Sequence, residues 1–303
     1  MIDTIKSQNF GIEIELTGIT RQNAANVIAN YFGTQSRYVG TYYQTYAATD
    51  RKGRSWKAMS DGSINCQRKA NGRTQRAGRD YSCEIVSPIL QYEDLEDLQN
   101  IVRALREAGA FSNSSCGIHV HIDGAGHTPY SLTRLVNFAI GRQDLFYEAL
   151  QIGDRANRWC QKMSIDLLNA MKKAEHTRSS METIWYSSAN DGYTNGIDHS
   201  HYNSTRYHGI NLHAFFTKGT VEFRLFNGTT HAGKIKAYIQ FCLAMSAWAK
   251  AENTERLFFK PCGAYTQEQK AALMQRVLVN RLGLKGAEFK TCRQHLTAAF
   301  TAA

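Results

Sequence analysis

Three short apolar runs each carry two polar side chains separated by one residue, an arrangement that could hold metal ions and phosphate. The pairs are Glu13 and Glu15, His119 and His121, and Glu222 and Arg224. Alternate side chains of a β-strand share a face and stand about 7 Å apart. A fourth run, residues 81–90, adds one carboxylate, Glu84. If these strands lie side by side, they predict a site for a cation-dependent reaction on a phosphate.

The ligand types favour magnesium or manganese. Glu13 and Glu15 could simply form the polar face of an antiparallel sheet, but two carboxylates on one face can also bind two neighbouring hard cations. His119 and His121 could be ordinary strand histidines or zinc ligands. Because the set is rich in carboxylates and no thiol is placed to join it, the pattern favours Mg²⁺ or Mn²⁺ over zinc.

The pair Glu222 and Arg224 could be a structural ion pair. A carboxylate beside a planar guanidinium also suits a site where a metal contacts one side of a transferring phosphoryl group and arginine contacts the other. Further candidate contacts for a nucleotide are Arg155, Arg158, Arg206 and Asn211. Taken singly, each of these arginines is more often a surface residue than a site residue.

Other chemistries find little support. The sequence holds no P-loop, no dinucleotide-binding glycine motif and no hydrolase nucleophile elbow. Cys116 and Cys160 could be nucleophiles, although a free cysteine is more often a small buried apolar residue. The 7 cysteines are scattered without a C-x-x-C pair, which argues against disulfides and zinc ribbons and predicts a reducing, cytoplasmic location.

The composition is that of a folded protein with a polyanionic partner. Hydrophobic residues make up 43% of 303 residues, enough for a substantial core. No run is long enough to cross a membrane, and none resembles a signal peptide, so we expect a soluble chain with no membrane partner. The net charge of +10 suits a nucleotide or a nucleic acid. Basic residues gather between residues 51 and 79, either as a solvated surface or as a contact arm for an acidic macromolecule.

The pattern of apolar residues predicts an α+β fold with antiparallel strands. Strands are expected over 10–16, 37–47, 55–59, 81–90, 116–122, 209–215 and 219–226, the last two as a hairpin. Helices are expected over 20–31, 92–108, 131–150, 162–187, 232–253, 266–282 and 286–300. The segments 66–80 and 188–206 are predicted as polar loops.

These motifs, in this order, resemble the amidoligase family of carboxylate–amine ligases, which is related to glutamine synthetase and glutamate–cysteine ligase. The matching segments are 10–15, 61–64, 84–90, 116–121, 211–212 and 220–228, and the resemblance covers about residues 8 to 250. It implies a curved, mostly antiparallel sheet with glutamine synthetase-like architecture, as a catalytic domain of residues 1–253 with a helical extension, 254–303, packed on it.

The resemblance also implies a reaction and residue roles. A substrate carboxylate would attack the γ-phosphate of ATP, and an amine would displace phosphate from the acyl phosphate, with two or three Mg²⁺ or Mn²⁺ ions bound. Its implied metal ligands are Glu13, Glu15, Glu84, His119 and Glu222. Arg224 would steady the transferring phosphoryl group, His121 would lie near the nucleotide, Arg206 near its phosphates and Asp61 near the amine.

Two other functions remain open at this stage. A metal-dependent hydrolase could use the same carboxylate and histidine face to activate water. A basic nucleic-acid-binding protein could keep a degenerate ligase fold and bind polyanions in a salt-sensitive way. Dependence on a nucleotide would separate the ligase from both.

Overall fold

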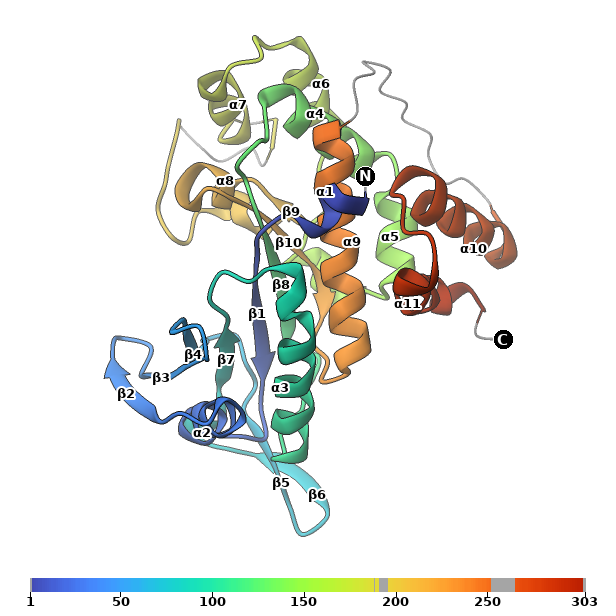
Figure 1. Cartoon of the computed structure of the whole chain (residues 1–303). Helices are drawn as coiled ribbons and strands as arrows, with labels where there is room; N and C mark the ends of the chain where they lie inside the picture. Colours follow the sequence, from blue (N-terminus) through green and yellow to red (C-terminus); the bar gives the residue numbers. More distant parts are fainter. Residues whose placement is uncertain (1, 188, 191–195, 252–264, 302–303) are drawn as a thin grey trace. The chain divides into compact units, whose positions relative to one another are not determined.

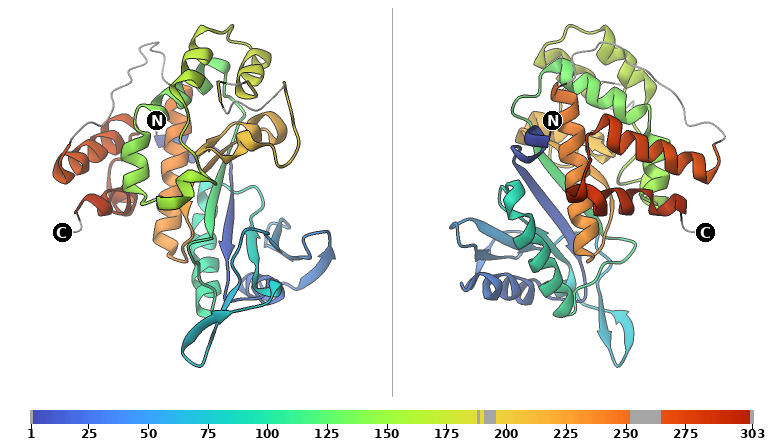
Figure 2. Two further views of the ribbon diagram at one scale, coloured as in Figure 1. Left: turned by 180° about the vertical axis from the view of Figure 1, so that it is seen from behind. Right: turned by 45° about the vertical axis from the view of Figure 1, so that its right-hand side comes forward.

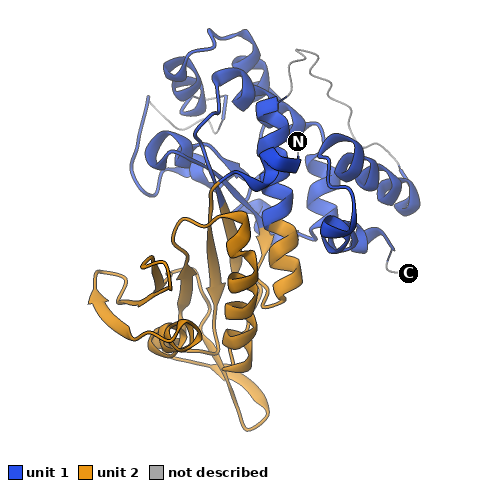
Figure 3. Ribbon diagram, viewed as in Figure 1, with its two compact units in different colours: residues 1–8, 121–225, 239–303 blue, residues 9–120, 226–238 orange. Residues whose placement is uncertain are grey.

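The computed structural model describes residues 2–187, 189–190, 196–251 and 265–301, and these form helices and mostly antiparallel strands (Figures 1 and 2). The chain divides into two compact units (Figure 3). Unit 1 comprises residues 1–8, 121–225 and 239–303, and unit 2 comprises residues 9–120 and 226–238. The predicted boundary between 1–253 and 254–303 lies outside the described residues, so that division stays a prediction.

Unit 2 is built on antiparallel strands covered by two helices. In hydrogen-bonded order the strands are β2 (Ser36–Gly40), β3 (Thr45–Thr49), β4 (Ser55–Met59), β7 (Cys83–Val86), β1 (Phe10–Leu16) and the first residues of β8 (Gly117–Asp123). The helices are α2 (Arg21–Phe32), which contacts β2, β3, β4 and β7, and α3 (Leu95–Glu107), which packs on α2. Along β1, Ile12 and Ile14 are buried in the core, so the alternate residues Glu13 and Glu15 lie on the opposite face.

The helix boundaries of unit 2 follow from capping residues, as the sequence predicted. The Thr20 side chain accepts a hydrogen bond from the backbone N–H of Asn23, and Gly33 ends α2 with a φ of 71°, a left-handed conformation that suits glycine. Leu98, Ile101 and Leu105 form the buried face of α3. The predicted helices over 20–31 and 92–108 are therefore confirmed.

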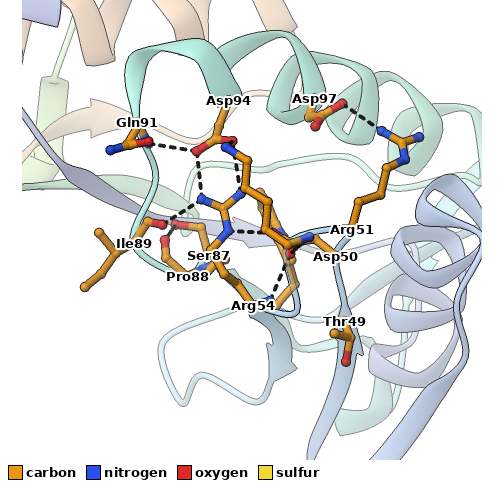
Figure 4. A network of polar contacts seen from close by, with 12 residues as sticks. Thr49, Asp50, Arg51, Arg54, Ser87, Pro88, Ile89, Gln91, Asp94 and Asp97 are labelled. Atoms are coloured by element: carbon orange, nitrogen blue, oxygen red, sulfur yellow. Dashed lines mark hydrogen bonds and ion pairs between the residues drawn. The ribbon is translucent and has the colours of Figure 1, made fainter. Parts of the chain in front are cut away.

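A buried ion-pair network joins the turn after β3 to the start of α3 (Figure 4). The Arg54 guanidinium donates to Asp50 Oδ2 at 2.8 Å, to Asp94 Oδ2 at 2.8 Å and to the Ile89 carbonyl at 3.0 Å. The side chains of Asp50 and Asp94 are 2% and 4% exposed. Asp94 also accepts from the backbone N–H of Gln91, so one carboxylate both caps the helical segment and binds the arginine.

Replacing Arg54 by methionine should destabilise the protein by about 3–5 kcal/mol, because it leaves two buried carboxylates without their shared cation. Urea denaturation followed by circular dichroism measures this loss. Arg51→Met is the matched control, since the Arg51 side chain is 61% exposed and its pair with Asp97 spans 3.5 Å; its cost should stay under about 1 kcal/mol. Equal losses in the two variants would contradict the stabilising role of the buried network.

The same network predicts a dependence of stability on pH. Burial favours the neutral form of Asp94, but hydrogen bonds from Arg54, the Gln91 backbone and Lys52 outweigh it and lower the pKa of Asp94 to about 2. A lowered pKa stabilises the fold above the ordinary value of 3.8, and this contribution is lost as the pH falls toward 2. The difference in urea midpoint between wild type and Asp94→Asn should hold above pH 4 and shrink toward pH 2. A difference that persisted at pH 2 would contradict the assignment.

Unit 1 is mainly helical. Its elements are α1 (Ile2–Lys6), α4 (Pro129–Ile140), α5 (Gln143–Ala149), α6 (Ile165–Lys173), α7 (Arg178–Trp185), α8 (His213–Lys218), α10 (Gln267–Arg276), α11 (Lys290–Thr301) and the strand β9 (Ile210–Asn211). The strand β10 (Thr220–Asn227) and the helix α9 (Ala232–Ala251) each lie partly in this unit. The unit 1 part of α9 is almost wholly buried, as expected for a helix that is apolar on all sides.

The structure corrects several predicted elements. The run predicted as a strand over 209–215 is a strand only at Ile210–Asn211, and β9 pairs with β10 as predicted, but α8 forms between them. A short buried apolar run does not distinguish strand from helix, and Ala214, Phe215 and Phe216 are all buried. The expected single strand over 37–47 is β2 and β3 with a turn between them.

Three further segments differ from expectation. The helix predicted over 131–150 breaks at Gly141 into α4 and α5, and that over 162–187 divides into α6 and α7, with Thr177 capping the second. The segment 66–80, predicted as a loop, forms the hairpin of β5 (Gln67–Ala70) and β6 (Arg73–Arg76). Part of the predicted loop 188–206 lies outside the described residues. Within the described part of the chain, no helix is long and apolar enough to cross a membrane.

Candidate active-site residues

Two carboxylates face each other on neighbouring strands of unit 2. The antiparallel register of β1 and β7 places Glu15 opposite Glu84, and Glu13 opposite Val86. Glu15 is buried and Glu84 is half-buried. Like charges directly opposite each other destabilise a sheet, so this pair lowers the stability of the fold unless a cation or a proton compensates it.

His119 connects the two carboxylates of β1. Its Nδ1 lies 3.0 Å from Glu13 Oε2, and its Nε2 lies 3.8 Å from Glu15 Oε1. The backbone N–H of Gly117 donates to Glu15 Oε2 at 2.6 Å. A histidine that binds a metal commonly directs its other ring nitrogen to a carboxylate. With Nδ1 directed to Glu13, Nε2 is the nitrogen that could bind a cation.

Asp61 completes this group from the segment after β4. Its Oδ1 accepts a hydrogen bond from the Ser63 backbone N–H at 2.6 Å, and Arg79 Nη2 donates to its carbonyl oxygen at 2.7 Å. We call Glu13, Glu15, Asp61, Glu84 and His119 the acidic cluster. Ligand atoms of Glu13, Glu84 and His119 lie within 4.8 Å of one another, as do those of Glu15, Asp61 and Glu84. The two groups share Glu84.

In unit 1, Glu222 and Arg224 form a buried pair on β10. Arg224 Nη1 donates to Glu222 Oε1 at 2.5 Å, and the two side chains are 5% and 3% exposed. Asn211, opposite Glu222 on β9, donates to Glu222 Oε2 at 2.7 Å. Both oxygens of Glu222 accept hydrogen bonds, one of them from Arg224, so Glu222 helps to hold Arg224 in place. Its role as a metal ligand stays a prediction.

His121 lies beside Thr220 and Glu222 in unit 1. Its Nδ1 is 3.0 Å from Thr220 Oγ1, and its Nε2 is 3.9 Å from Glu222 Oε1. The side chain is 11% exposed. His121 thus joins Glu222, Arg224 and Asn211 in one buried polar group, which we call the arginine cluster.

Aromatic rings accompany the candidate arginines of unit 1. Arg224 and Arg206 lie 5.9 Å and 5.6 Å from the ring centre of Tyr207. The exposed Arg158 lies 4.3 Å from the Trp159 ring, and Arg224 Nε donates to the Trp159 carbonyl at 3.3 Å. The structure therefore links Arg158, Arg206 and Arg224 through two rings that contact each other with centroids 5.5 Å apart.

Neither Trp159 nor Tyr207 is among the site residues predicted from the sequence. Trp159 follows Arg158 directly, and Tyr207 follows Arg206, so the adjacency of aromatic and basic residues was a usable signal. Arginine commonly stacks on aromatic faces at sites that bind phosphates. The sequence alone gives no reason to expect contact between Trp159 and Tyr207, which are 48 positions apart.

The remaining candidates are buried, and the nucleotide contact expected of Arg155 stays a prediction. Arg155 is buried in a short 3-10 helix, and Cys116 and Cys160 are fully buried. Burial raises the pKa of the Cys160 thiol, although Arg155 and Arg224 act against this shift. A buried thiol with a raised pKa is a poor nucleophile, so Cys160 is unsuited to that role.

Comparisons with known proteins show the family of the chain. No curated protein matches the sequence. The chain is distantly similar to the solved structure of a bifunctional glutathione synthetase from Pasteurella multocida, with 13% identity and a TM-score of 0.39. That alignment covers 98% of this chain and 48% of the synthetase, so the chain spans about half of its length. The family model described as "Putative amidoligase enzyme" matches residues 6–246, a range that contains both clusters, and the chain belongs to this amidoligase family.

Proposed function

We propose that this protein is an ATP- and Mg²⁺-dependent ligase that joins a carboxylate to an amine through an acyl phosphate. Family membership supports a ligase in general. The observation that supports the cation-dependent chemistry most directly is the register that places Glu15 opposite Glu84, with His119 next to Glu13 and Glu15. The curved, glutamine synthetase-like form of the sheet belongs to this proposal.

The acidic cluster fits hard divalent cations. Carboxylate oxygens are the ligands that Mg²⁺ prefers, and the cluster offers four carboxylates and one imidazole. Its two overlapping groups share Glu84, which suits two neighbouring ions. When bound, Mg²⁺ would neutralise charge on the phosphate oxygens of ATP. Glu13, Glu15, Glu84 and His119 would hold these ions, and Asp61 would stay beside them for the amine.

The arginine cluster would stabilise the charge that develops during phosphoryl transfer. Glu222 and the Trp159 carbonyl hold the Arg224 guanidinium by two of its nitrogens, so its position is fixed before the reaction. A donor oriented in advance stabilises a transition state without the cost of reorganisation. Arg206, linked to Arg224 through Tyr207, would contact other phosphate oxygens, and His121 would bind the nucleotide.

The chemistry proceeds in two steps. An oxygen of the substrate carboxylate attacks the γ-phosphorus, and the bond from that phosphorus to the ADP oxygen breaks. The amine nitrogen then attacks the acyl carbon, the carbon–oxygen bond to phosphate breaks, and the amine gives up a proton. Asp61, held by Ser63 and Arg79, would attract the amine and accept that proton.

Mass spectrometry can identify the substrates and test the reaction. Purified protein, ATP and Mg²⁺ are added to a cell lysate, and products are sought whose mass equals that of two components less one water. With a substrate carboxylate labelled with ¹⁸O, one ¹⁸O should appear in the released phosphate. Turnover without consumption of ATP would instead indicate a metal-dependent hydrolase and reject the ligase.

A further inference from the structure

The hairpin of β5 and β6 is an exposed two-stranded ribbon of unit 2 that extends beyond the unit's other strands (Figures 1 and 2). Asn71 and Gly72 join its strands with φ values of 50° and 74°. Two consecutive residues with positive φ form the tight hairpin turn whose twist matches that of the strands. We call residues 67–76 the basic ribbon.

The basic ribbon carries positive charge on both faces. It contains four cations, Arg68, Lys69, Arg73 and Arg76, all exposed, and no acidic residue. The register places Arg76 opposite Gln67, Lys69 opposite Thr74, Arg68 opposite Gln75 and Arg73 opposite Ala70. Since alternate residues share a face, one face presents Lys69 and Arg76, and the other presents Arg68 and Arg73.

The base of the basic ribbon is anchored to the end of β1. The backbone N–H of Gly18 and the hydroxyl of Thr17 both donate to the Gln67 carbonyl at 2.9 Å. Asn113 donates to the Gln67 side chain at 2.9 Å, and Lys69 Nζ lies 5.5 Å from the centre of the Phe111 ring. These contacts hold the ribbon in a defined orientation, so its cations are presented as a fixed array.

We propose that the basic ribbon binds the phosphate backbone of double-stranded DNA, a partner that goes beyond the proposed ligase activity. A two-stranded ribbon fits the major groove of B-form DNA, which is about 12 Å wide. Arginine, which supplies three of the four cations, matches phosphate geometry with its planar fork. The interleaved glutamine, asparagine and threonine side chains can donate to phosphate and sugar oxygens.

The side chains of the ribbon favour double-stranded over single-stranded nucleic acid. Residues 67–76 contain no aromatic side chain, so the ribbon lacks the stacking surface on which single-stranded bases bind. Cations on both faces suit a partner that presents phosphates on either side, as the two backbones that border a groove do. Binding is therefore expected to depend on charge and to be independent of base sequence.

Fluorescence anisotropy with a labelled 20-base-pair duplex of mixed sequence tests this proposal. Four phosphate contacts predict a slope of about −3.6 for log K against log salt, which is a loss of about 150-fold between 50 and 200 mM salt. The variant Arg68→Gln/Lys69→Gln/Arg73→Gln/Arg76→Gln should lose most of the affinity and of this slope. The pair variants Arg68→Gln/Arg73→Gln and Lys69→Gln/Arg76→Gln should each lose about half of the slope.

The matched control removes the same charge elsewhere. Lys173, Arg281, Lys285 and Lys290 are exposed residues of unit 1, and changing all four to glutamine should leave the slope near its wild-type value. Equal loss in this control would show a general charge effect and overturn the proposal. Equal binding of a single strand of the same length, or equal competition by polyglutamate, would also overturn it. Thermal melting of each variant confirms that it is folded. Because the assay needs no ATP, its failure leaves the ligase proposal standing.

Discussion

Replacing Arg224 by lysine should lower ATP-dependent turnover by about 10³-fold or more and leave the protein folded. Lysine keeps the charge that balances the buried Glu222, but it loses the planar fork that reaches Glu222 and the Trp159 carbonyl together. An arginine that stabilises a transferring phosphoryl group contributes about 10³ to 10⁵ in rate. Release of ADP, measured with the identified substrates, gives the change in turnover, and thermal melting reports the fold.

Lysine is preferable to alanine at this position. The structure buries both Glu222 and Arg224. Removing one partner of a buried pair costs about 3–5 kcal/mol of stability. Turnover lost in an alanine variant would then reflect unfolding as well as the loss of the catalytic group. Arg178→Lys is the control, because Arg178 is exposed and stacks on Phe215 in the same unit. Undiminished turnover in Arg224→Lys would remove the catalytic role of Arg224.

Replacing Glu84 by glutamine should remove most of the stabilisation that magnesium gives the protein. In EDTA, wild type carries the repulsion between Glu15 and Glu84, and the variant should melt at a higher temperature. With Mg²⁺ at about 100 times its Kd, wild type should gain about 2.7 kcal/mol, and the variant should gain much less. Turnover should fall by at least about 100-fold, since even indirect disturbance of a metal site costs 10- to 100-fold.

The control for this experiment is Glu107→Gln, which removes a carboxylate from the exposed end of α3 in the same unit. Its melting temperature should respond to Mg²⁺ as that of wild type does. Thermal melting of wild type and of both variants, with and without Mg²⁺, gives all six values. If Mg²⁺ stabilises Glu84→Gln as much as wild type, Glu84 is not a ligand and the acidic cluster is not the metal site.

Local patterns made much of unit 2 predictable. Glu13 and Glu15 alternate with buried Ile12 and Ile14, so the strand, its core face and its charged face could all be predicted from spacing. Thr20 and Gly33 mark the ends of α2 because their side-chain and backbone requirements are local. The mixed α+β class with antiparallel strands follows from the same patterns.

Other features depended on contacts that spacing does not encode. The segment that forms α8 carries the short buried apolar run Ala214, Phe215 and Phe216, and such a run fits a strand as well as a helix. The basic ribbon lacks apolar alternation, and its pairing rests on the Asn71-Gly72 turn and on its anchoring through Gln67. In the candidate site, strand spacing identified the charged pairs, but the opposition of Glu15 and Glu84 needed the register of two strands 69 residues apart (84 minus 15).

The Arg54 network connects two segments of unit 2 that are far apart in the sequence, so local unfolding of one should accompany local unfolding of the other. Asp94 caps the helical segment at Gln91 and also binds Arg54. If that helix end frayed, the Arg54 guanidinium in the turn after β3 would lose one of its carboxylate partners. Local opening events of this kind are visible as exchange of backbone amides with solvent deuterium. The amides at this helix end and in that turn are therefore expected to exchange together, as one cooperative unit.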